Sequence, residues 1–183
     1  GDDIHQFTGS LSISGSRISI DDGDDNIAIG KSTLASITPG GAQNVAIGTN
    51  AMTNASGANT DGNVVIGYNA GDAFGANNVY GTVLIGRQAG SSINNGDAAG
   101  TTAIGYNAGA SITSGQRNVV MGYQAGLLMT TMDDTVAIGY GAGDALSTGT
   151  GRNVVIGSAA GSALTTESQI VAIGSSVMSS ATN

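Results

Sequence analysis

The sequence predicts an all-β fold, a stack of about nine short β-coils, and three observations support this. A five-residue block recurs nine times, at intervals of 17 to 19 residues, which is the signature of a repeat architecture. Within the blocks, β-branched residues recur at every second position, as they do in a strand. Glycine supplies 31 of the 183 residues, so tight corners are available between the strands.

Each block begins with a residue that is polar in eight of the nine copies. Three apolar columns follow, apart from Thr102: a β-branched residue, a small or aliphatic residue, and Ile or Met. Gly ends the block. The β-branched first column and the Ile column flank a middle column of Ala, Val and Leu. Both faces of each strand are therefore apolar and should be buried, one inside the coil and one against a second partner. The blocks are Asn26–Gly30, Asn44–Gly48, Asn63–Gly67, Thr82–Gly86, Thr101–Gly105, Asn118–Gly122, Thr135–Gly139, Asn153–Gly157 and Ile170–Gly174.

A second short element follows each block. Six copies continue with two variable residues, Ala and Gly, as in Tyr68–Gly71, and a further apolar column stands seven residues after the block glycine. Loops rich in Gly, Asn, Asp, Ser and Thr complete the coils. A coil this narrow has a thin core, so we expect the middle column, Ala at five of nine positions, to form a subunit interface.

The first 25 residues differ from the rest and predict a separate segment. Leu11, Ile13, Ile18 and Ile20 alternate with serine, as in short strands joined by glycine turns. We therefore divide the chain into a β shaft and junction, 1–25, and the repeat roll, 26–183. The acidic junction Asp21–Asp25 has two interpretations, a cation site and a solvated turn, and we favour the turn.

Composition excludes several function classes. The absence of Cys rules out disulfides and thiolate zinc sites, and the single histidine, His5, makes a histidine-based triad or metal cluster improbable. A net charge of −8 with five basic residues argues against nucleic-acid binding, and no apolar run is long enough to span a membrane. We expect no cofactor and no metal. The start at Gly1, without Met, suggests a fragment or a processed product.

The VAIG block followed by xxA resembles the head repeats of YadA-like trimeric autotransporter adhesins. The fuller form GYNAG, in Asn63–Gly71 and Thr102–Gly109, looks more like the rolls of bacteriophage tail fibres, and His5–Ser16 resembles fibre-shaft segments. The resemblance implies a left-handed parallel β-roll, three chains packed about one axis, with the Val and Ile columns filling the roll and the middle column facing the axis. It implies a virion tail fibre or, alternatively, a bacterial cell-surface location.

We expect a homotrimeric attachment fibre or adhesin segment that forms or presents a binding site for a host-surface glycan or protein, without catalysis. A pure spacer is its plainest variant. One alternative is a polysaccharide-degrading fibre domain, but the acids of the repeats form no recurring pair. An acyltransferase β-helix lacks its histidine base here, and an ice-binding solenoid lacks a threonine ladder in one column.

Recognition, if this segment provides it, should come from loops held on the rigid coils. The longest loops, Ala55–Gly62, Gly75–Gly81 and Asn94–Gly100, are consecutive and predict one projecting band. Its candidate binding residues are Asn59, Asp61, Asn77, Asn78, Tyr80, Asn94, Asn95 and Asp97.

Two further columns have structural interpretations. Tyr68, Tyr106, Tyr123 and Tyr140 share one column and predict an aromatic ladder, with a sugar-stacking groove as the alternative. The block asparagines predict a turn ladder that satisfies backbone groups.

Overall fold

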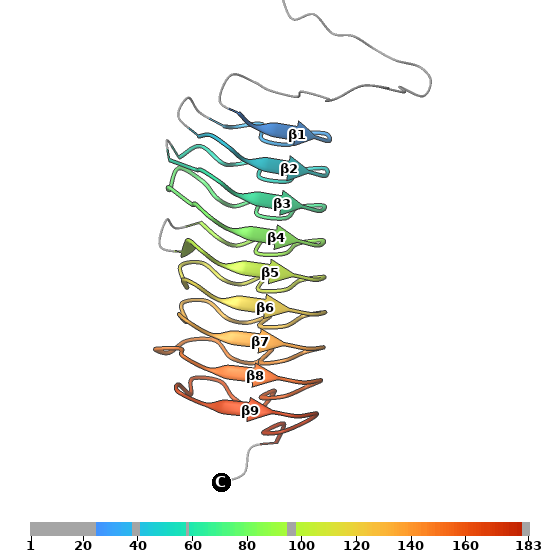
Figure 1. Ribbon diagram of the computed structural model, residues 1–183, viewed down its shortest axis with the longest axis vertical. Coiled ribbons are helices and arrows are strands. Elements are labelled where there is room, and N and C mark those ends of the chain that lie inside the picture. Colours follow the sequence, from blue (N-terminus) through green and yellow to red (C-terminus); the bar gives the residue numbers. More distant parts are fainter. Residues whose placement is uncertain (1–24, 38–40, 58, 95–97, 181–183) are drawn as a thin grey trace, which may run out of the picture.

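The computed structural model describes residues 25–37, 41–57, 59–94 and 98–180, and these form a parallel β-solenoid (Figure 1). Nine three-residue strands stack in chain order into one sheet along the long axis of the molecule, and no described residue lies in an α-helix. The proposed shaft, 1–25, lies outside the described residues except for Asp25. The strands are β1 (Ile27–Ile29), β2 (Val45–Ile47), β3 (Val64–Ile66), β4 (Val83–Ile85), β5 (Thr102–Ile104), β6 (Val119–Met121), β7 (Val136–Ile138), β8 (Val154–Ile156) and β9 (Val171–Ile173).

Neighbouring strands pair in parallel with the sequence blocks aligned column upon column. Val65 of β3 pairs with Leu84 of β4, for example, and Leu84 pairs with Ala103 of β5. The same register holds from β1 to β9, so the loops take up the whole variation in coil length. The nine predicted strands and their order are therefore confirmed.

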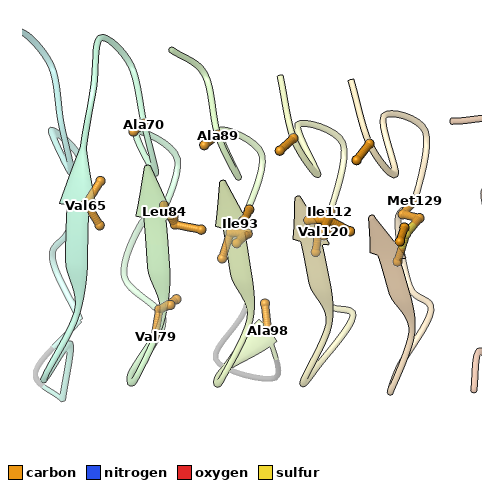
Figure 2. Close-up of a cluster of buried hydrophobic side chains, with 14 of the residues drawn as sticks. Val65, Ala70, Val79, Leu84, Ala89, Ile93, Ala98, Ile112, Val120 and Met129 are labelled. Atoms are coloured by element: carbon orange, nitrogen blue, oxygen red, sulfur yellow. The ribbon is translucent and has the colours of Figure 1, made fainter. Parts of the chain in front are cut away.

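The middle column of the strands fills the interior of the roll. Val65, Leu84, Ala103 and Val120 are fully buried within the single chain. Figure 2 shows Val65, Leu84 and Val120 within the cluster of buried side chains. In the seven coils that follow Gly48 to Gly157, the alanine three residues after the block glycine and the apolar residue seven after it complete the core. Those two columns contribute Ala51, Ala70, Ala89, Ala108, Ala125, Ala142 and Ala160, and Ala55, Phe74, Ile93, Ile112, Met129, Leu146 and Leu164.

The expected orientation of the strands is therefore wrong, because the middle column faces inward and not toward a subunit axis. The β-branched first column and the Ile column point outward instead, and in β2 to β8 each flanks a fully buried middle residue while remaining half-exposed. The reason is space. Strands only three residues long enclose a narrow interior, and each strand contributes one side chain to it.

Close backbone approach explains why glycine ends every block. Gly67 has φ of +141°, and a Cβ there would stand 2.3 Å from the carbonyl oxygen of Gly86 in the next coil. The same contact recurs between successive block glycines. A side chain in this column is excluded both by its own backbone conformation and by the backbone of the next coil.

The predicted asparagine ladder lies inside the roll and satisfies backbone groups between coils. Asn63 donates from Nδ2 to the Asn44 side-chain oxygen and to the Val79 carbonyl, both at 2.9 Å. Its own Oδ1 accepts from the Thr82 main-chain N–H at 3.0 Å and from the Thr82 hydroxyl at 2.8 Å. Threonine can therefore continue the ladder where asparagine is replaced.

Replacing Asn63 with alanine is expected to lower the free energy of unfolding by about 3 kcal/mol, because buried groups of Val79 and Thr82 would lose this partner. The Asn44 side-chain oxygen would keep only its bond from the Asn63 main-chain N–H. Asn63→Thr should cost less than half as much, since Thr82 occupies the same column in the next coil. Urea titration followed by circular dichroism measures both values. Equal costs for the two variants would contradict a hydrogen-bonding role for the column.

Candidate functional site

The outer face of the sheet is a narrow apolar strip that the described residues leave partly exposed. It consists of the first and third residues of the nine strands, apolar at every position except Thr102. Eight steps between strands at about 4.8 Å each give a length of about 38 Å. An apolar surface of this length, partly exposed in β2 to β8 and more exposed in β9, is typical of an interaction surface.

A ladder of stacked side chains runs beside the strip, one residue after the block glycines. The rings of Tyr106 and Tyr123 stack at 5.1 Å between centroids, and those of Tyr123 and Tyr140 at 5.4 Å. Arg87 continues the column, with its guanidinium carbon 5.5 Å from the Tyr68 ring centroid and 5.4 Å from that of Tyr106. Most ring faces are thus occupied within the column, so the aromatic ladder is confirmed and a sugar-stacking groove along it has little free ring surface.

The predicted loop residues stack upon one another along the turns. The main-chain N–H of Asn59 donates to the Asn78 side-chain oxygen at 3.1 Å, and the Asn77 amide contacts the carbonyl of Asn94. Asp61 is partly exposed and is held by the main-chain N–H of Ala42 at 2.8 Å.

Of the eight candidate residues of the predicted band, six are described by the structure, and all six are at least partly exposed. Asn59, Asn77, Asn78, Tyr80 and Asn94 are exposed, whereas Asn95 and Asp97 lie outside the described residues. Ala55, Gly57, Thr60 and Val79, within the same loops, are buried. The loops therefore lie against the roll in part, rather than projecting along their whole length.

The candidate residue Tyr80 forms one wall of a hollow of about 210 Å³ beside the sheet. Ala99 and Gly100 line the hollow from the next coil, and Gln116 and Arg117 from the coil after that. Gly100 donates its N–H to the Tyr80 carbonyl, and Arg117 donates its N–H to the Ala99 carbonyl, so backbone bonds tie the three coils together. The hollow exists because two coils with bulky side chains enclose one whose residues are small.

Arg117 is held in place by a carboxylate. Its Nε and Nη2 atoms donate to the two oxygens of Asp134 at 2.6 and 3.0 Å, and Nη1 contacts the Gln116 side-chain oxygen. The hydrogen bond from Arg117 holds the pKa of the Asp134 carboxyl below its ordinary value. In the same way, Asp134 raises the pKa of the Arg117 guanidinium. Both groups are therefore charged at neutral pH.

Other carboxylates of the coils support the backbone. Asp133 accepts the main-chain N–H of Gln116 at 2.8 Å, just as Asp61 accepts that of Ala42. Within the described ranges no three His, Cys, Asp or Glu side chains gather closely enough to hold a metal ion. Of the acidic junction only Asp25 is described, and Asp21, Asp22 and Asp24 lie outside the described residues, as does His5.

Sequence reasoning identified Tyr80 but missed its partners in the hollow. The signal was present two coils later, where the same turn carries Gln116 and Arg117 while the coil between carries Ala99 and Gly100. This difference in residue size is visible only when the turns before the strands are aligned. The block motif covers the strands and not these turns.

No protein-family model, curated protein or solved structure matches the chain. None of the residues that the structure describes forms a helix with the length and hydropathy of a membrane span.

Proposed function

We propose that the chain is a segment of a homotrimeric attachment fibre or adhesin, which forms or presents a binding site for a host-surface glycan or protein and does no catalysis. The observation that carries this proposal is the apolar outer strip on a roll whose coils are all in one register. The likeness of the repeats to YadA-like heads and phage tail fibres supports a left-handed roll on a virion fibre or a bacterial surface.

A parallel assembly suits the shape of the strip. Every strand contributes the same two columns to the strip, because all strands share one register. If several chains pack in parallel about an axis that runs along the stack of strands, equivalent residues of each chain meet at every level of that axis. The strip is only two columns wide, flanked by the buried asparagine or threonine column on one side and the glycine column on the other. A narrow strip facing an axis favours three chains around it, and the exposed turns then point outward.

The other candidate functions have less support in the described coils. The carboxylates Asp61 and Asp133 are engaged by backbone N–H groups, which gives them structural roles. Thr60, Thr82, Thr101 and Thr135 are buried, so they offer no surface ladder to ice. These observations favour a structural and binding role.

The mass of the purified chain in solution tests the proposal. We expect light scattering to give three times the 17.8 kDa chain mass, over a wide range of concentration. We also expect the labelled protein to bind host cells or their isolated surface polysaccharide. A monomer that unfolds cooperatively would contradict the trimer, and a trimer that binds no host surface would reduce the segment to a spacer.

A further inference from the structure

We propose that the hollow between Tyr80 and Arg117 binds one neutral hexopyranose unit of a surface glycan. This deepens the proposed function, on which it rests for the source of the glycan, by naming the site and the class of ligand. The hollow lies at the turn before the strands, off the apolar strip. It therefore stays accessible when the strip is covered.

The dimensions suit a single sugar ring. Tyr80 and Arg117 belong to coils two steps apart, which separates them by about 10 Å along the stack. A ring with contacts of about 3.5–4.0 Å on each face fills most of that spacing. The volume of about 210 Å³ is below the range of drug-sized pockets, which begins at about 300 Å³.

The small residues of the middle coil keep the hollow open. Gly100 has φ of +71°, and a Cβ there would meet the Arg117 side chain at 3.7 Å. The column before Gly100 carries Ala99, whereas its neighbours carry Tyr80 and Gln116. Any larger residue at position 99 would occupy the space that the sugar needs.

The chemistry of the walls is what a sugar requires. Tyr80 is 55% exposed and offers a ring face for the C–H groups of a pyranose. Arg117 uses three of its five N–H hydrogens on Asp134 and Gln116, which leaves two for hydroxyl groups. The Gln116 amide nitrogen and the Tyr80 hydroxyl have no partner among the described residues. A rigid apolar face beside fixed donors is the usual composition of a specific small-ligand site.

Charge favours a neutral ligand over an acidic one. The Asp134 carboxylate already neutralises the Arg117 guanidinium, and Asp133 lies in the same turn. The chain carries a net charge of −8, so an anionic glycan would approach against the field of the protein. We therefore assign a neutral hexose rather than a uronic or sialic acid.

Saturation-transfer NMR with the intact chain tests the site, using the methyl glycosides of glucose, galactose, mannose and N-acetylglucosamine as probes. We expect at least one to bind with a Kd on the order of millimolar. Tyr80→Ala should weaken that binding about tenfold, and Ala99→Gln, which places in the hollow a residue that the same column already carries at position 116, should abolish it. The matched control is Tyr140→Ala, which removes a similarly exposed ring from outside the hollow.

Three results would overturn the proposal: no transfer to any of the glycosides, equal weakening by Tyr80→Ala and Tyr140→Ala, or binding confined to glucuronic or sialic acid. Light scattering on the same samples separates this proposal from the one before it. A trimer that binds none of the probes rejects the sugar site alone, whereas a monomer that binds a glycoside through Tyr80 rejects the trimer alone.

Discussion

Gly105→Ala is expected to prevent the central coils from folding. The added Cβ would stand 2.4 Å from the carbonyl oxygen of Gly122, and φ of +134° is a conformation that alanine adopts only with strain. Relief would require β5 and β6 to separate, which breaks the sheet in its middle. We expect a loss of at least about 4 kcal/mol in the free energy of unfolding, measured by urea titration and circular dichroism.

Gly81→Ala is the matched control for this substitution. Gly81 also has a positive φ, +65°, but a Cβ there would meet nothing within 4 Å, and other coils place Gln43 or Arg117 in the same column with a similar backbone. Its cost should be about 1 kcal/mol, from backbone preference alone. Similar losses for the two variants would show that inter-coil contact does not set the requirement for glycine.

Ile104→Asp should convert the proposed trimer into monomers. Ile104 lies at the centre of the outer strip, so three copies of the carboxylate would meet near the axis in an apolar environment. Unpaired buried charges of this kind are not tolerated in an interface. Light scattering should fall from three chain masses to one, while circular dichroism reports whether the roll persists.

Leu128→Asp controls for the general effect of adding a charge. Leu128 is an exposed apolar residue outside the strands, so its replacement should leave the mass unchanged. Dissociation by both variants, or by neither, would contradict an interface at the strip. Ala103→Glu would not test the interface. The Ala103 side chain is buried inside the roll, so a glutamate there should unfold the coil.

Much of the fold could be predicted because the pattern repeats. Nine aligned copies define the strand column by column, and the structure places the strands at the predicted residues. The roles of the glycine and asparagine columns also follow from their chemistry. Glycine allows the backbones of successive coils to approach closely, and the asparagine amides form hydrogen bonds between coils.

The side of the strand that faces inward could not be read from the same pattern. Alternation distinguishes two faces, but here both are apolar, and the larger Val and Ile residues suggested a core. The decisive signal was the buried Asn63, which lies two residues before Val65 and therefore on the same face of the strand. The hollow at Tyr80 was not predicted either. It depends on residues that differ between coils, whereas the repeat pattern shows only the residues that the coils share.

The common register of the strands has one more consequence. Among the nine strands, each one contacts only its immediate neighbours in the stack, so a coil added or removed changes only the contacts beside it. Recombination between two copies of the block would lengthen or shorten the rod in steps of about 4.8 Å and leave every remaining column aligned. The copy number of the repeat thus sets the length of the rod, and with it the distance at which the rod can hold one partner from another.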